Sequence, residues 1–275
     1  MTLEVAPAIA TVRGLTPDGT AYADTGAGDA VVLIHGVGMQ QGVWAPQVAH
    51  LARTHRVVVY DMLGHGASLA AEHALVLSDY ADQLQRLLDH LGIAQASIAG
   101  HSMGALVALE FALTRPARTR RVAALNAVYR RTPEQRAAVM ARARMLRQAG
   151  APASVGPTLE RWFGNPVPPT LQAAAREVGS YLAQVQLQGY AQAYAVFASA
   201  DEVHAARLGQ LRMPALFATG EFDANSSPQM TRAMAAEVPG AVADVLPGAR
   251  HMMTVTDADA VNAHLDHWLQ MPVAR

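Results

Sequence analysis

Two kinds of hydrophobic pattern alternate along this chain, and together they predict a sheet protein with flanking helices. Unbroken apolar, β-branched runs are typical of strands that are buried on both faces of a parallel sheet. Such runs occupy residues 30–34, 56–60, 96–100, 121–126, 214–219 and 241–246. Weaker runs at 9–13 and 20–24 surround the turn sequence Thr16-Pro17-Asp18-Gly19, which predicts an antiparallel hairpin at the start.

Between the strands, apolar residues recur every three or four positions, which predicts amphipathic helices. One helix is expected over 43–52. A second is expected to begin with Ser78 as its N-cap and to end at Gly92. Three more follow the strands: one from Ala105 to Thr114, one from Ser227-Pro228 to Val238, and a last one that carries Val261, Leu265 and Trp268 on one face.

The alternation stops between residues 128 and 207. Thr132-Pro133-Glu134-Gln135 has the pattern of a helix start with a capping box, and no β-prone run follows it. Glycines and prolines, among them Gly150 and Pro152, divide the segment into several helices. We therefore predict an α/β fold in which residues 1–127 and 208–275 form a mostly parallel sheet flanked by helices, and 128–207 form an inserted helical cap.

The amino-acid composition limits which partners and which cellular environment are expected. The 275 residues are 51% hydrophobic and 16% charged, with a net charge of −1, so neither nucleic acid nor an anionic membrane is expected as a partner. There are no cysteines, which excludes disulfides, thiolate metal sites and a cysteine nucleophile. The first twelve residues lack the pattern of a secretory signal. We expect a soluble, cytoplasmic protein that acts on a small molecule, whose oligomeric state the sequence leaves open.

The segment Gly100-His101-Ser102-Met103-Gly104 lies where a predicted strand gives way to a predicted helix. Gly-x-Ser-x-Gly in this context is the nucleophile elbow, a strained turn that lifts the serine hydroxyl clear of the sheet. Ser102 is therefore the candidate nucleophile. The N–H of Met103, at the positive end of the following helix, is a candidate donor to an oxyanion.

A second glycine-containing loop, His35-Gly36-Val37-Gly38-Met39, follows the strand at 30–34. Its position at the carboxyl end of a strand makes the N–H of Val37 the candidate second oxyanion donor. Asp61 follows the next strand, but it precedes the nucleophile in sequence, so we interpret it as a residue that stabilises a turn.

A serine nucleophile needs a base, and the base needs an acid to orient it. Asp223 and His251 follow two successive late strands, so both are expected at the sheet edge where Ser102 stands. Glu221 is the alternative acid. His35 and His101 are interpreted as neighbours of the site, and His264 and His267 as solvated or core-edge residues of the last helix.

The chain resembles the α/β-hydrolase superfamily over nearly its whole length, on the loop 35–38, the turn 61–66, the elbow 100–104 and the segments ending in Asp223 and His251. The resemblance implies a serine hydrolase that acts through an acyl-enzyme. Ser102 argues against the dehalogenases and epoxide hydrolases of this fold, which use aspartate. Met252 stands where carbon–carbon bond hydrolases typically have tryptophan, which makes a carbon–carbon bond hydrolase a less favoured alternative. An acyltransferase or perhydrolase, or a non-catalytic receptor, also stays open.

The nearest likeness within the superfamily is to enol-lactonase-like and amide-cleaving hydrolases of aromatic degradation. No metal-ligand spacing and no dinucleotide-binding glycine motif occurs in the sequence, so we expect no metal and no cofactor. In the predicted cap, Arg161-Trp162-Phe163 joins a guanidinium to large apolar rings. We predict that Trp162 lines the acyl pocket and that Arg161 binds a remote carboxylate of a small acidic ester, enol lactone or amide.

Overall fold

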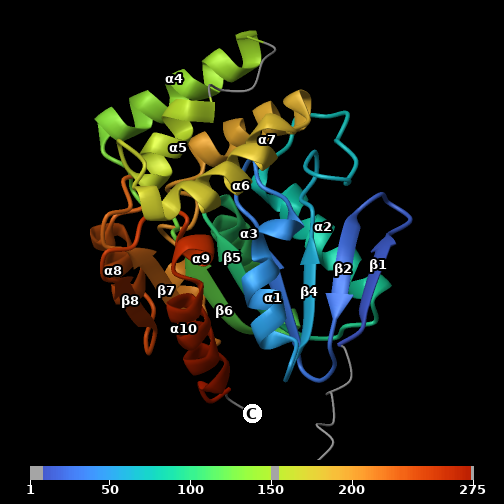
Figure 1. Ribbon diagram of the computed structural model, residues 1–275. Helices are drawn as coiled ribbons and strands as arrows, with labels where there is room; N and C mark the ends of the chain where they lie inside the picture. The colour runs from blue at the N-terminus through green and yellow to red at the C-terminus, as the bar shows by residue number, and fades with distance from the viewer. Residues whose placement is uncertain (1–8, 150–154, 274–275) are drawn as a thin grey trace, which may run out of the picture.

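The computed structural model describes residues 9–149 and 155–273, and an eight-stranded sheet forms its centre (Figure 1). The strands are β1 (Thr11–Leu15), β2 (Ala21–Thr25), β3 (Ala30–Ile34), β4 (Arg56–Tyr60), β5 (Ala96–His101), β6 (Thr119–Leu125), β7 (Ala215–Gly220) and β8 (Val242–Leu246). They lie in the order β1-β2-β4-β3-β5-β6-β7-β8. Strands β3 to β8 run parallel, whereas β1 and β2 pair antiparallel. The predicted fold class and the opening hairpin are both confirmed.

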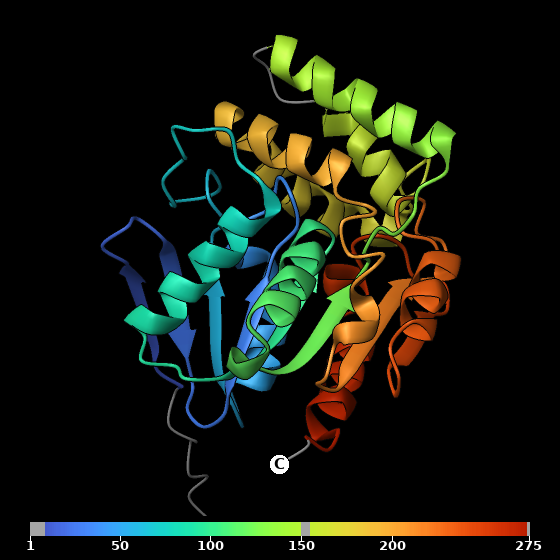
Figure 2. The ribbon, with the colours of Figure 1, turned by 180° about the vertical axis from the view of Figure 1, so that it is seen from behind.

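Helices cover both faces of the sheet. One face carries α2 (Leu77–His90), α3 (Met103–Thr114) and α8 (Pro228–Ala236), as Figure 2 shows. The other carries α1 (Ala45–Leu51), α9 (Met253–Thr256) and α10 (Ala258–Gln270). Because successive strand residues point to opposite faces, Val32 packs in the first apolar core and Val31 in the second. This two-sided burial explains why the strand runs are apolar throughout.

The helix boundaries differ from the predictions in two places. Ser78 is not an N-cap: α2 begins at Leu77, because the Asp79 carboxylate accepts the N–H of Val76 at 2.7 Å and fixes the start earlier. The helix expected over 43–52 begins as a 3₁₀ turn, η1 (Gln41–Trp44), before α1. Further 3₁₀ turns are η2 (Pro116–Arg118), η3 (Pro169–Leu171) and η4 (Leu208–Gln210).

Other helix signals are confirmed. The hydroxyl of Thr132 accepts the N–H of Gln135 at 3.2 Å, and the Gln135 side chain accepts the N–H of Thr132 at 2.9 Å, which is a capping box. Ser227 caps α8 by accepting the N–H of Met230 at 3.3 Å. Gly92 follows α2 with φ of 64°, the conformation that ends helices. Among the described helices, none combines the length and the apolar character needed to cross a membrane.

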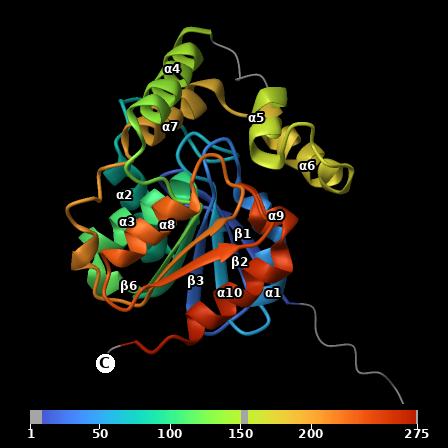
Figure 3. The ribbon, with the colours of Figure 1, turned by 90° about the vertical axis from the view of Figure 1, so that its left-hand side faces the viewer.

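Four helices lie beyond the carboxyl ends of the parallel strands (Figure 1): α4 (Pro133–Ala149), α5 (Val155–Phe163), α6 (Gln172–Ala183) and α7 (Leu187–Ser199). They form two pairs, α4 with α7 and α5 with α6, which stand side by side in Figure 3. The described parts of 128–207 contain no strand, and the predicted breaks at Gly150 and Pro152 lie outside the described residues. Helix α7 packs closely against the loop that follows β4. A Cβ added to Gly189 would lie 2.4 Å from the Cα atom of Gly64, so only glycine fits at this contact.

Candidate active site

The elbow has the backbone geometry that its glycines suggest. Ser102 stands between β5 and α3 with φ of 55° and ψ of −116°, a conformation that costs free energy in a residue with a side chain. A Cβ on Gly100 would lie 2.0 Å from the carbonyl oxygen of Gly104, and one on Gly104 would lie 2.2 Å from that of Ile34. The N–H of Ser102 donates to Leu125 at 2.8 Å and ties the turn to β6. Glycine is therefore required at both positions.

Asp223 and His251 meet at the carboxyl edge of the sheet. His251 Nδ1 and Asp223 Oδ2 are 2.8 Å apart, and both side chains are almost wholly buried. Because a carboxylate accepts, the imidazole donates from Nδ1 and presents Nε2 as its basic nitrogen. Glu221, the alternative acid, is occupied elsewhere, since it accepts the N–H of Gly248 at 2.8 Å.

Three further groups donate to the Asp223 carboxylate. The N–H groups of Asn225 and Ser226 bond Oδ1 at 2.8 and 3.2 Å, and the Asn126 amide bonds Oδ2 at 2.8 Å. Burial would raise the pKa of Asp223, but the nearby His251 and these hydrogen bonds hold that pKa below its usual value. Asp223 is thus an ionised acceptor for the imidazole.

Asn126 was not predicted from the sequence. It follows β6 directly, at the same sheet edge, and its φ of 53° turns the chain so that the amide reaches Asp223. A polar residue just after a central strand is a signal for such a position, but in this sequence Asn126 also continues the β-prone run 121–126.

Two aromatic rings flank His251. The indole of Trp162 lies on one side, with ring centroids 5.4 Å apart, and the imidazole of His101 on another, at 5.0 Å. His101 Nε2 donates to the His251 carbonyl oxygen at 2.8 Å. Burial, and then the proximity of His251, lower the pKa of His101 to about 3, so His101 is a neutral neighbour. The ring of His251 is therefore confined on more than one side.

Two buried neutral histidines hold the loop that carries Val37. His35 donates from Nδ1 to the Gly36 oxygen at 2.8 Å and accepts the N–H of Met62 at 3.0 Å. His65 accepts the N–H of Gly38 at 3.1 Å. Burial lowers the pKa of His35 to about 4 and that of His65 to about 3.

The turn that contains Asp61 supports the same loop. Asp61 accepts the N–H groups of Gln41 at 2.7 Å and Ala67 at 2.9 Å, as expected for a residue that stabilises a turn. Within the described part of the chain, the N–H of Val37 has no acceptor. Met103 is the first residue of α3, where an N–H has no partner inside the helix. Among the described residues, neither N–H group donates to a protein oxygen.

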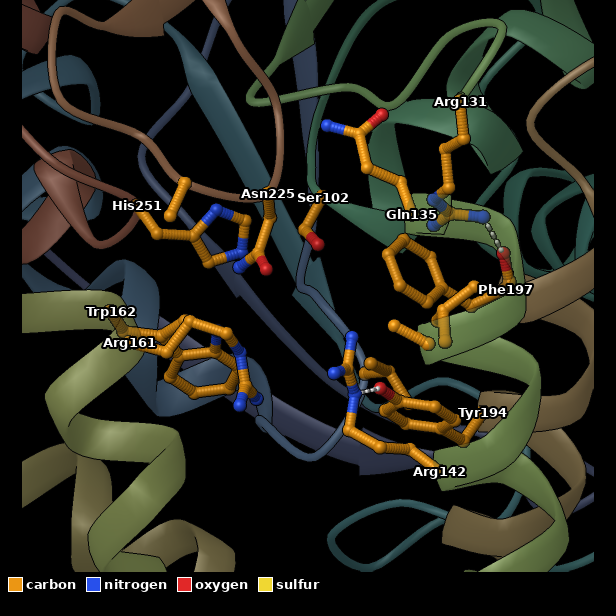
Figure 4. A pocket seen from close by; sticks show the side chains of 14 residues that line it. Ser102, Arg131, Gln135, Arg142, Arg161, Trp162, Tyr194, Phe197, Asn225 and His251 are labelled. Carbon is orange, nitrogen blue, oxygen red and sulfur yellow. Dashed lines mark hydrogen bonds between the residues drawn. The ribbon is translucent and has the colours of Figure 1, made fainter. Parts of the chain in front are cut away.

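A cavity of about 210 Å³ lies between the sheet edge and the two helix pairs (Figure 4). Ser102 and His251 enter it from the sheet side, together with Val37. Trp162 and Arg161 line it from α5. Its remaining lining residues are Arg131, Gln135, Ala138, Val139, Arg142, Tyr194, Phe197, Ala224 and Asn225.

The described residues that line the cavity include three arginines and no Asp or Glu. Arg131 is buried and pairs with Asp201, whereas Arg142 donates from Nε to the Tyr194 hydroxyl at 2.9 Å. Burial, and then the positive charge of Arg142, lower the pKa of Arg161. Among the residues described, no group of three or more His, Asp or Glu side chains is placed to hold a metal ion.

Comparison with known proteins identifies the class. Residues 29–258 match the family model of the alpha/beta hydrolase fold. The chain is 37% identical over 249 residues to (E)-2-((N-methylformamido)methylene)succinate hydrolase of Acinetobacter baylyi, covering 90% of this chain and 93% of that protein. It is 32% identical to 3-oxoadipate enol-lactonase 1 of the same organism, over 70% of this chain and 71% of the relative.

A solved structure of a related enzyme supports the same fold assignment. The enol-lactonase from Burkholderia xenovorans LB400 superposes with a TM-score of 0.85 at 26% identity, covering 94% of this chain and 99% of that one. The chain belongs to the α/β-hydrolase fold family. It is an enzyme of the hydrolase type.

Proposed function

We propose that this protein is a cofactor-independent serine hydrolase whose triad is Ser102, His251 and Asp223. The observation that carries the proposal is the buried Asp223–His251 hydrogen bond of 2.8 Å beside a cavity into which the strained Ser102 projects. Asp223 keeps the Nδ1 proton in place, so that Nε2 of His251 accepts the proton of Ser102 as its oxygen attacks a carbonyl carbon.

The tetrahedral intermediate carries a negative oxygen, for which we assign the N–H groups of Val37 and Met103 as donors. Neither N–H donates to a protein oxygen among the described residues, and Met103 stands at the positive end of α3, which supports this assignment. Collapse of the intermediate breaks the bond to the leaving group, which takes the proton from His251. Water, activated by the same imidazole, then hydrolyses the acyl-enzyme and restores Ser102.

Residues 128–207 act in this proposal as a cap, and residues 1–127 and 208–275 as the catalytic core. The position of α4 to α7 beyond the carboxyl ends of the strands supports this division (Figure 3). The cap supplies the greater part of the cavity lining from α4, α5 and α7. It would exclude bulk water from the acyl-enzyme and select the substrate.

The substrate in this proposal is a small ester, enol lactone or amide that bears a carboxylate. Arg161 would bind the carboxylate, and Trp162 would line the acyl pocket. The cavity is small, and its described lining has three arginines and no acidic side chain, which favours an anion. The names of two relatives, a substituted succinate hydrolase and a 3-oxoadipate enol-lactonase, also refer to carboxylates.

A fluorophosphonate probe tests for a live nucleophile. Peptide mapping should place the label on Ser102, and the same protein should hydrolyse 4-nitrophenyl acetate. A labelled protein that turns over no carbonyl substrate would instead support a receptor of this fold.

Substrate class is tested by comparing 4-nitrophenyl hydrogen succinate, which has a free carboxylate, with its neutral methyl ester. The wild type should prefer the acid, and Arg161→Ala should remove about 1.5–3 kcal/mol of that preference, the scale of a hydrogen bond to a charged group. Arg176→Ala, on the exposed face of α6, is the matched control. Equal rates for acid and ester in the wild type would refute a carboxylate-bearing substrate.

A further inference from the structure

Two arginines line the cavity from opposite helix pairs, and no acidic partner of either occurs among the described residues. Arg142 comes from α4 and Arg161 from α5, and Figure 4 shows their guanidinium groups facing the same space. In the described part of the chain, neither forms an ion pair, whereas the third cavity arginine, Arg131, is paired with Asp201 at 3.3 Å. Among the described residues, two positively charged side chains therefore line the cavity that contains Ser102 without an acidic side chain paired to them.

Arg142 is held in one orientation. Its Nε donates to the Tyr194 hydroxyl of α7 at 2.9 Å, which leaves both terminal amino groups for another acceptor. Tyr194 is buried and packs edge-on against Tyr190 and Phe197. A guanidinium fixed in this way loses little side-chain entropy when it binds a carboxylate.

Arg161 is positioned from the opposite side. It is partly buried on α5, with long contacts of 3.4 Å to the Pro157 oxygen and the Thr158 hydroxyl. The repulsion between Arg161 and Arg142, together with the partial burial of both, costs free energy while the cavity lacks an anion. An occupant with two negative charges removes that cost, because it neutralises both groups and joins the two helix pairs.

We propose that Arg142, oriented by Tyr194, and Arg161 form a two-arginine site for a substrate that carries two carboxylates. This inference rests on the proposed function, in that it places the substrate in the Ser102 cavity. It deepens that function: the bond to be cleaved belongs to a small dicarboxylate, and Arg142 is a second specificity-determining residue.

Binding of succinate, which has two carboxylates, and levulinate, which replaces one of them by a methyl ketone, tests the site without any turnover. Titration calorimetry near neutral pH should show succinate binding about 10- to 100-fold more tightly to the wild type. Arg142→Gln and Arg161→Gln should each bring the ratio of the two dissociation constants towards one. Arg144→Gln, on the exposed face of α4, should leave that ratio unchanged.

Tyr194→Phe tests the same site in a second way, because it removes only the hydroxyl that accepts the hydrogen bond from Arg142. It should lower the preference for succinate over levulinate partially. Circular dichroism verifies that each variant is folded. Equal affinities for succinate and levulinate in the wild type would overturn the proposal, as would an unchanged ratio in folded Arg142→Gln. Ser102→Ala should keep the succinate preference, so a failure of the proposed chemistry would be seen separately from a failure of the binding site.

Discussion

The indole of Trp162 lies against the imidazole of His251, with ring planes inclined by 35° and centroids 5.4 Å apart. This contact joins α5 to the proposed general base. Trp162 follows Arg161 directly in sequence, so a single helix turn contacts both the proposed substrate carboxylate and the proposed base. The position of α5 should therefore influence the chemical step as well as substrate binding.

Replacing Trp162 should lower kcat. Aromatic pairs are worth about 0.5–1.5 kcal/mol beyond the area they bury, so Trp162→Leu should reduce kcat by roughly 2- to 12-fold through a less confined His251. Trp162→Phe keeps a ring at the contact and should recover most of the rate. Steady-state kinetics with 4-nitrophenyl acetate measures both variants. A Leu variant with wild-type kcat would show that the contact does not position the base.

The ionised Asp223 should be essential for rate but not for folding. Asp223→Asn keeps the shape of the side chain but cannot hold the Nδ1–H tautomer of His251, and should lower kcat on the order of 10⁴-fold, as in a serine protease. Glu221→Gln is the control, because Glu221 contacts Gly248 and not His251. A small effect of Asp223→Asn, together with a large effect of Glu221→Gln, would show that Glu221 and not Asp223 is the acid.

Stability should fall in mild acid because three histidines are buried in neutral form. The pKa values of His35, His65 and His101 lie at about 4, 3 and 3, below the usual ~6.5 of an unfolded chain. Between these values the unfolded state binds more protons, so the free energy of unfolding decreases as pH falls, by up to about 1.4 kcal/mol per pH unit for each histidine.

Urea unfolding between about pH 6.5 and pH 4 measures this slope. His65→Gln should remove the contribution of one buried histidine to the slope of unfolding free energy against pH. His267 is exposed on α10, so His267→Gln should leave the slope as in the wild type. An unchanged slope in His65→Gln would mean that His65 is not the neutral buried group described above.

Gly104→Ala should prevent correct folding of the elbow. The added Cβ would lie 2.2 Å from the Ile34 oxygen and 2.5 Å from the His35 oxygen, both of them backbone atoms that cannot move without disturbing β3. We expect a loss of more than about 4 kcal/mol. Gly156→Ala is the matched control in α5, since a Cβ there meets nothing within 4 Å and should be neutral or slightly stabilising. Similar melting temperatures for the two variants would contradict this account of the glycines.

The sheet, and the positions in it of the proposed catalytic residues, could be predicted because their signals are local. An unbroken apolar run such as 30–34 shows that both faces of a strand are covered, and the strand-glycine-serine-glycine-helix order specifies the turn at Ser102. Strand ends in a parallel sheet share one edge, so Asp223 and His251 could be placed there without coordinates.

The side of the cavity that α4, α5 and α7 line could not be predicted in the same way. The sequence contains several arginines on α4 and α5, and only the three-dimensional packing shows that Arg142 faces the cavity whereas Arg144 is exposed. Likewise, the capping effect of Asp79 on Val76 competes with Ser78, and the sequence pattern does not show which of the two wins. Both cases depend on the direction of a side chain, which hydrophobic periodicity alone does not determine.

Replacement of Ser102 tests the central claim most directly. The wild type and Ser102→Ala would be compared for hydrolysis of 4-nitrophenyl acetate, with circular dichroism to verify the fold. Mass spectrometry would follow the acetyl group on the protein after rapid mixing. We predict acetylation of Ser102 in the wild type, and neither acetylation at this site nor turnover above background in Ser102→Ala. Unchanged turnover by folded Ser102→Ala would contradict the account.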